Sequence, residues 1–145
     1  MSASPSSQSP LVLAIDLGSS GVRVALVDAA GRVLGSATEA VAMRLLPDGG
    51  AEEDPEEIWT ALGRSIQRAL AAAPDTRTRI AAILCGSQYS SLVPVDATGR
   101  PLGPLVLYLD TRGTRASLEL TGRHPELWKL WLERHGLPSA GNGSD

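Results

Sequence analysis

The sequence predicts an α/β domain in which an antiparallel three-stranded meander is followed by a crossover helix and a parallel strand. Apolar residues fill 11–17 and alternate through 21–28, as they do in strands. The apolar period changes to four residues over 51–73, as in a helix, and a further apolar run follows at 79–86. With 145 residues, 43% of them hydrophobic, the chain is long enough to bury a core.

The meander follows from strand and turn signals at the beginning of this region. Residues 11–17 are apolar on both faces, which predicts a central buried strand. In the second strand Val22, Val24 and Leu26 share one face, and Arg23 lies on the other. Asp28 and Gly31 supply the residue types of a tight turn, and residues 32–46 then form the third predicted strand.

The helix has clear signals at both ends. Asp54 suits an N-cap and Pro55 suits the first helical position, while Pro74 prevents continuation. The apolar residues that recur every four positions are Ile58, Leu62, Ile66 and Leu70. The run 79–86 is then expected to be a buried strand, and the preceding crossover helix favours parallel pairing with an earlier strand.

The remaining segments carry weaker signals. A second hairpin is predicted over 91–110, where "VDATGRPLG" echoes the earlier "VDAAGRVLG" because both turns need the same residue types. A short helix is predicted over 124–136. Residues 1–10 are rich in Ser and Pro and are expected to form a disordered lead-in.

Composition excludes several classes of function. The formal net charge of -3 does not favour binding to nucleic acid or to an anionic membrane. The lone Cys85 rules out a disulfide within the chain and is expected to be a buried structural thiol. No apolar run approaches the roughly 20 residues that span a bilayer, so we expect a cytoplasmic location.

The hinge "DLGSSG" at residues 16–21 is open to two interpretations: an ordinary turn, or a backbone cradle for phosphate groups. Asp16 follows an uncharged strand, Gly18 allows close approach of the backbone, and Ser19 and Ser20 offer hydroxyl and N–H groups. A carboxylate beside phosphates requires a cation between them, which makes Asp16 a candidate Mg²⁺ ligand. The patterns of a P-loop and of a Rossmann dinucleotide site are absent.

Three stretches in order resemble the N-terminal domain of the FGGY carbohydrate kinases, the group that includes xylulokinase, gluconokinase and glycerol kinase. They are "LAIDLGSSGVRVALVDAAGRVLG", "EEDPEEIWTALGRSI" and "IAAILCGSQYSSLVPVDATGRPLGPLVLYLDTRG". Together they span most of residues 11–113. The resemblance implies a ribonuclease H-like fold of the actin, heat-shock chaperone and sugar kinase ATPase superfamily.

The resemblance also implies the cofactors and a set of site residues. ATP and Mg²⁺ would be the cofactors, with Mg²⁺ positioned by Asp16. The residues implied to face the phosphates are Gly18, Ser19 and Ser20. Those implied to contact a sugar or polyol are Gln88, Tyr89, Ser90, Tyr108, Asp110 and Arg112. Tyr89, Ser90 and Tyr108 depart from the residues usual in the family, so this sequence leaves the identity of the sugar open.

FGGY kinases are several times longer, and their second domain carries the general base. The resemblance therefore implies that residues 11–145 are a partial N-terminal domain, that this portion contains no catalytic base, and that it is inactive alone. One alternative is a non-catalytic half-domain that self-associates or pairs with a separate missing domain. Another is an actin-like or chaperone-like ATPase domain.

Overall fold

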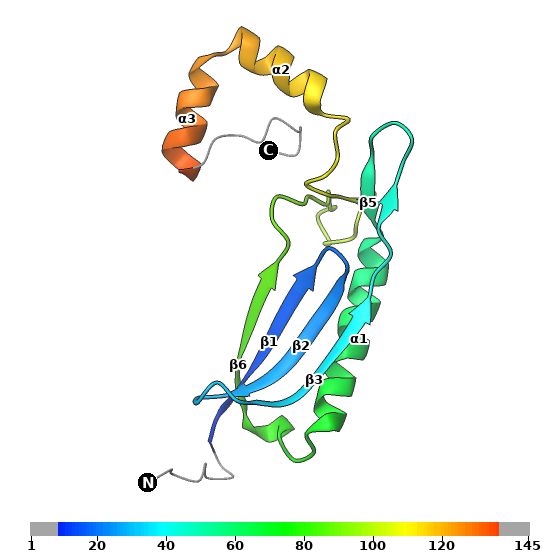
Figure 1. Ribbon diagram of the computed structural model, residues 1–145, viewed down its shortest axis with the longest axis vertical. Coiled ribbons are helices and arrows are strands. Elements are labelled where there is room, and N and C mark those ends of the chain that lie inside the picture. Colours follow the sequence, from blue (N-terminus) through cyan, green and yellow to red (C-terminus); the bar gives the residue numbers. More distant parts are fainter. Residues whose placement is uncertain (1–8, 137–145) are drawn as a thin grey trace. The chain divides into compact units, whose positions relative to one another are not determined.

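A computed structural model describes residues 9–136, which fall into two compact units. The first comprises residues up to Ala42 together with Glu56–Gln88, and the second comprises Met43–Pro55 and the chain from Tyr89 onward. Most of the predicted lead-in over residues 1–10 lies outside the described residues. The mixed α/β class is confirmed, and each unit is considered in turn (Figure 1).

The first unit is built on a four-stranded sheet of order β3-β2-β1-β6. Its strands are β1 (Leu11–Gly18), β2 (Gly21–Asp28), β3 (Val33–Ala40) and β6 (Ile80–Ser87). The first three pair antiparallel, and β6 pairs parallel to β1 after the crossover by helix α1 (Pro55–Ala72). The predicted meander, crossover helix and parallel strand are all confirmed. A short 3-10 helix, η1 (Arg77–Arg79), precedes β6.

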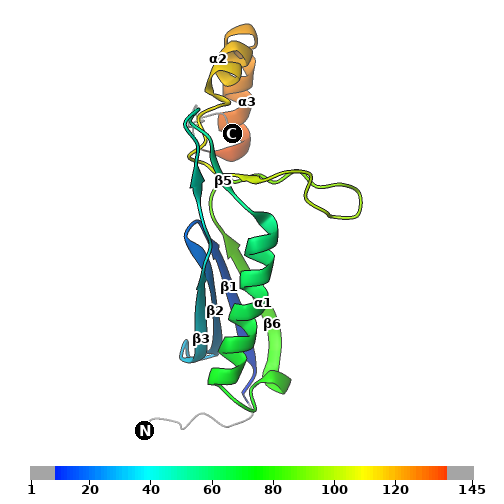
Figure 2. The ribbon, with the colours of Figure 1, turned by 90° about the vertical axis from the view of Figure 1, so that its right-hand side faces the viewer.

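Helix α1 lies along one face of this sheet (Figure 2). Its fully buried residues are small: Ala61, Ser65 and Ala69. The longer aliphatic residues predicted to form the apolar face flank them and are only partly buried: Ile58, Leu62, Ile66 and Leu70. At Gly35 on β3, an added Cβ would lie 2.5 Å from the Ala69 carbonyl oxygen, so small residues on both elements permit a close approach.

Strand β6 is an edge strand, and this overturns two expectations. The run 79–86 was expected to be buried, yet Ile83 and Leu84 are 67% and 66% exposed. Cys85 is exposed as well, contrary to the buried thiol expected from its apolar neighbours. The reason is that, within this strand, only Ile80 packs against the core that the sheet forms with α1.

The second unit contains a three-stranded sheet of order β4-β5-β7. Its strands are short: β4 (Arg44–Leu45), β5 (Ala51–Glu53) and β7 (Leu105–Val106). The third strand predicted over 32–46 is therefore wrong beyond Ala40, because Arg44 and Leu45 pair with β5 instead. Helix α2 (Thr114–Arg123) was not predicted, whereas α3 (Glu126–His135) confirms the helix expected over 124–136.

The two predicted hairpin turns share their hydrogen bonding. The Asp28 carboxylate accepts from the backbone N–H groups of Ala30 and Arg32. The Asp96 carboxylate accepts from those of Thr98 and Arg100 in the same way. The echo between the two segments therefore reflects common turn chemistry.

None of the helices in the described part of the chain is both long and apolar enough to cross a membrane.

Candidate functional site

The hinge between β1 and β2 is a tight hairpin turn formed by Ser19 and Ser20. Gly18 pairs with Gly21 across the turn, and the register places Asp16 opposite Arg23. A Cβ on Gly21 would collide with the carbonyl oxygen of a β3 residue, Glu39, which explains the glycine. The turn therefore has ordinary hairpin geometry, and this geometry brings a carboxylate, two serines and a guanidinium to one end of the sheet.

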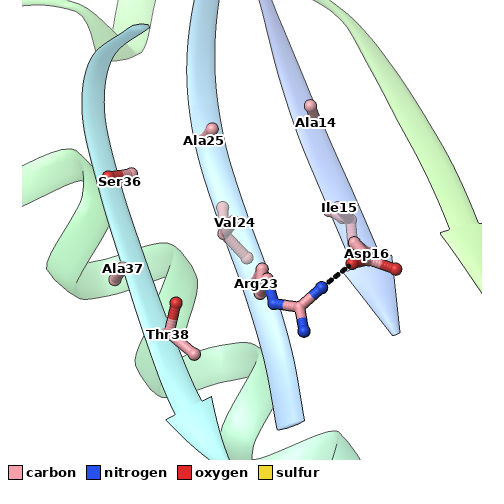
Figure 3. A pocket seen from close by; sticks show the side chains of 9 residues that line it. All are labelled: Ala14, Ile15, Asp16, Arg23, Val24, Ala25, Ser36, Ala37 and Thr38. Carbon is pink, nitrogen blue, oxygen red and sulfur yellow. Dashed lines mark hydrogen bonds and ion pairs between the residues drawn. The ribbon is translucent and has the colours of Figure 1, made fainter. Parts of the chain in front are cut away.

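An ion pair joins Asp16 to Arg23 beside this turn. Nη1 of Arg23 lies 2.7 Å from Oδ2 of Asp16, as Figure 3 shows. The two side chains are 58% and 50% exposed respectively, so both groups remain accessible to a ligand. A Cβ on Gly18 would lie 3.9 Å from the Arg23 guanidinium nitrogens, which places this cation close to the turn.

Sequence reasoning did not include Arg23 in the site. The signal was present, because a hairpin with Ser19 and Ser20 alone in its turn pairs residue 16 with residue 23. Paired residues in an antiparallel ladder place their side chains on the same face. The register alone would therefore have predicted the ion pair.

A shallow depression of about 340 Å³ lies beside the ion pair. Its lining comes from three neighbouring strands and combines the two charged residues with uncharged small and aliphatic ones: Ala14, Ile15, Asp16, Arg23, Val24, Ala25, Ser36, Ala37 and Thr38 (Figure 3). The neighbours of the charged pair along the strands, Ile15 and Val24, point toward α1: Val24 belongs to the core under the helix, and Ile15 packs against it. The charged pair thus projects from the sheet face opposite the helix.

The donor set at Asp16 is compatible with Mg²⁺. Among residues 9–136 no group of three or more His, Cys, Asp or Glu side chains could hold a metal ion. Mg²⁺ does not need such a cage, because it commonly binds through one or two carboxylates, retained waters and substrate phosphates. The accessible carboxylate of Asp16 beside two serines fits that mode.

Gln88 lies near the same end of the sheet. Its backbone N–H donates to the carbonyl oxygen of Leu17 at 2.9 Å, so the residue directly after β6 is held beside the end of β1. The structure therefore brings Gln88 close to the turn that contains Ser19 and Ser20.

The other predicted substrate residues lie in the second unit. Tyr89 is 61% exposed, and Ser90 has a φ of 51°, a left-handed conformation that is unfavourable for a residue with a side chain. Tyr108 is 38% exposed and Asp110 only 4%. The structure gathers Tyr108, Asp110 and Arg112 on one short segment.

Asp110 and Arg112 are bound mainly to each other. Nη2 of Arg112 lies 2.6 Å from Oδ2 of Asp110 and 2.8 Å from Oε1 of Glu52. The hydrogen bond from the Arg112 guanidinium lowers the pKa of Asp110 to about 2, despite its burial. The same hydrogen bond raises the pKa of Arg112 further above its ordinary value. Glu52, which sequence reasoning placed only in the motif before the helix, is thus part of this cluster.

Comparison with known proteins identifies the fold and the family. A xyloylose kinase from Brucella ovis superposes with a TM-score of 0.75 at 29% identity, covering 87% of this chain and 30% of that one. The chain is 32% identical over 127 residues to a glycerol kinase of Corynebacterium glutamicum (strain R), covering 87% of this chain and 25% of that protein. It is 36% identical over 140 residues to a xylulose kinase of Streptomyces coelicolor, covering 92% and 27% respectively.

The fold is the actin-like ATPase fold as it occurs in sugar kinases. Residues 11–126 match the N-terminal domain of the FGGY family of carbohydrate kinases, and the chain belongs to that family. The resemblance inferred from the three sequence stretches is confirmed. The chain spans about a quarter of the length of the curated relatives it matches.

Proposed function

We propose that the chain is the N-terminal portion of an ATP-dependent carbohydrate kinase, which transfers the γ-phosphate of ATP to a hydroxyl of a sugar or polyol. One observation carries the proposal: the hairpin turn of an FGGY N-terminal domain presents the accessible Asp16 carboxylate beside Ser19 and Ser20. A cytoplasmic location belongs to the same proposal.

The turn supplies the groups that phosphates require. Backbone N–H groups and hydroxyls of Gly18, Ser19 and Ser20 bind the β- and γ-phosphates. Arg23 adds guanidinium donors, since a guanidinium has five N–H groups and Asp16 occupies one nitrogen. Asp16 would hold Mg²⁺, and the bound ion would offset the charge of the phosphates.

The substrate side of the proposal rests on Gln88, Tyr89, Ser90 and Tyr108. Their side chains offer an amide, a hydroxyl and two phenols, which are the groups that recognise sugar hydroxyls by hydrogen bonding and stacking. The relatives are named for glycerol and xylulose, which makes these two compounds the first substrates to test.

We also propose that this portion is inactive alone. Phosphoryl transfer depends on holding both reactants in line and on a base that accepts the hydroxyl proton. We assign the role of this base to none of the carboxylates among residues 9–136. Loss of a general base typically costs about 10²–10⁴ in rate.

Binding of MgATP to the chain, measured by isothermal titration calorimetry, tests the phosphate site. We expect Asp16→Asn to weaken binding by roughly tenfold or more, because a metal ligand is lost. Glu133→Gln on α3 removes the same charge from an exposed helix and serves as the matched control. Equal binding by the Asp16 and Glu133 variants, or no binding by the unaltered chain, would contradict the proposed phosphate site.

Release of ADP in the presence of glycerol or D-xylulose tests the inactivity. We expect none above the rate without sugar. Turnover by the chain itself would show that the general base lies within it.

A second candidate function is a non-catalytic module that pairs with a second copy of itself. It is favoured by the exposed apolar residues Ile83 and Leu84 on the edge strand β6, since an uncharged edge of this kind readily pairs with another strand. Light scattering is the test. We expect Ile83→Lys to dissociate any dimer, and a monomer at all concentrations would contradict this candidate.

A further inference from the structure

The segment from Leu105 to Arg112 forms an interrupted strand along residues 49–53, which include β5. In β7, Leu105 and Val106 pair with Glu53 and Glu52 in a regular antiparallel ladder. The next N–H, that of Leu107, donates to the carbonyl oxygen of Ala51 at 2.9 Å. A four-residue turn then intervenes, closed by the Asp110 N–H donating to the Leu107 carbonyl oxygen at 2.9 Å.

The pairing resumes beyond this turn. The Thr111 N–H donates to the carbonyl oxygen of Gly49 at 3.0 Å. Tyr108 and Leu109 are thus the two residues that the turn lifts out of the ladder, and both are exposed, at 38% and 44%. Leu107, by contrast, is fully buried.

The Asp110 carboxylate takes the place of the backbone acceptor that the turn removes. Its Oδ2 accepts from the Ala51 N–H at 3.0 Å. The backbone of Ala51 is therefore held on both sides, by the Leu107 N–H at its oxygen and by the Asp110 carboxylate at its nitrogen. The two ends of the Tyr108 turn are anchored to one residue of β5.

Arg112 fixes that carboxylate in turn. Its backbone N–H donates to Oδ1 of Asp110 at 3.0 Å, and its guanidinium donates to Oδ2 at 2.6 Å and to Glu52 at 2.8 Å. A Cβ on Gly50 would lie 2.9 Å from Cζ of Arg112, so the guanidinium rests directly on the backbone at Gly50, the residue before β5. Both carboxylate oxygens are occupied by donors of the chain itself.

We propose that Asp110 and Arg112 are positioning residues that fix the turn carrying Tyr108, and that substrate contact in this segment belongs to Tyr108. The proposal rests on the proposed function for its substrate part only. It replaces the direct sugar contact that the family resemblance implies for Asp110. A carboxylate that is 4% exposed and fully engaged by backbone and guanidinium donors offers a sugar hydroxyl neither room nor a free lone pair.

The positioning part is tested without a sugar, by NMR on the whole chain. The sequence has two tyrosines, so the ring signals of Tyr108 are read against Tyr89 as an internal reference. We expect Asp110→Ala to speed amide exchange at Ala51 by about tenfold or more and to shift the Tyr108 ring signals, while those of Tyr89 stay in place. Unchanged Ala51 exchange and unchanged Tyr108 signals would overturn the proposal.

Two further variants keep the test decisive. Asp96→Asn alters another turn aspartate that accepts backbone hydrogen bonds in the same unit, and it should leave Ala51 and Tyr108 unaffected. Arg112→Lys keeps the charge but loses the planar fork, and should shift Tyr108 in the same direction by a smaller amount. If Asp110→Ala fails to fold, Arg112→Lys becomes the deciding variant. Unchanged Tyr108 ring signals in Arg112→Lys would then overturn the proposal.

The substrate part is tested by a double-mutant cycle on the affinity for D-xylulose and for glycerol. If Asp110 acts through Tyr108, Asp110→Ala weakens sugar binding in the unaltered chain but costs nothing further in the Tyr108→Ala background. Additive losses would show that Asp110 contacts the sugar itself and would overturn the proposal. Absence of sugar binding in the unaltered chain would count against the proposed function, while the NMR result would still decide the positioning role.

Discussion

The close approach of α1 to the sheet predicts a large difference between two Gly→Ala substitutions in the first unit. At Gly35 on β3 an added Cβ would lie 2.5 Å from the Ala69 carbonyl oxygen and 2.9 Å from the Ala73 Cβ. The first distance is about 1 Å shorter than an ordinary van der Waals contact. Because the obstacle is helix backbone, it cannot be relieved by rotating a side chain.

The substitution Gly35→Ala is therefore expected to cost about 1–3 kcal/mol of unfolding free energy, as overpacking of a filled core typically does. For a chain of this size each kcal/mol corresponds to roughly 4 °C in Tm. Gly63 in the middle of α1 is the matched control, since an added Cβ there meets nothing within 4 Å. Gly63→Ala should stabilise the chain by about 1 kcal/mol, because alanine is the better helix former.

Urea unfolding and thermal unfolding followed by circular dichroism measure both variants. Gly63→Ala is expected to have the highest Tm, the unaltered chain an intermediate one, and Gly35→Ala the lowest. If Gly35→Ala matched or exceeded the unaltered chain while Gly63→Ala behaved as expected, the tight packing of α1 against β3 would be refuted.

Two further predictions concern the turn between β1 and β2 and the acid stability of the chain. Gly21→Ala should destabilise the chain more than Gly31→Ala. An added Cβ at Gly21 would collide with the β3 backbone, whereas one at Gly31 meets nothing within 4 Å. The urea midpoints of the two variants measure the difference. The pKa of Asp110 is lowered from 3.8 in the unfolded chain to about 2 in the fold. The ionised carboxylate therefore stabilises the fold fully above about pH 4, and this contribution is lost as the pH falls toward 2. The loss should reach about 2 kcal/mol at most and should be absent in Asp110→Asn; an unchanged acid dependence in that variant would contradict the assignment.

Most of the local structure, and membership of the family, could be predicted from the sequence alone. Alternating valines predicted β2, four-residue spacing predicted α1, and a helix between two apolar runs predicted parallel pairing of β6 with β1. These signals are local, because side-chain periodicity repeats with the geometry of each element. The predicted third strand is too long because residues 41–43 belong to no strand, although the run 32–46 has continuous strand propensity.

For the site, the sequence alone located the turn with Ser19 and Ser20 and placed Asp16 beside it. It also contained the register that pairs Asp16 with Arg23, because that pairing follows from the length of the turn. Sequence spacing says which residues face one another across a hairpin, but nothing about what covers them.

Which residues are buried, and what each charged group binds, depend on the packing of the folded chain. Cys85 and Ile83 are exposed because, within β6, only Ile80 packs against the core under α1, and this depends on where the helix crosses the sheet. Asp110 is buried and accepts a hydrogen bond from the Ala51 N–H, which lies 59 residues earlier in the chain, so its local sequence shows neither the partner nor the burial. Such contacts arise from the packing of distant segments, and neither composition nor periodicity encodes the distance between them.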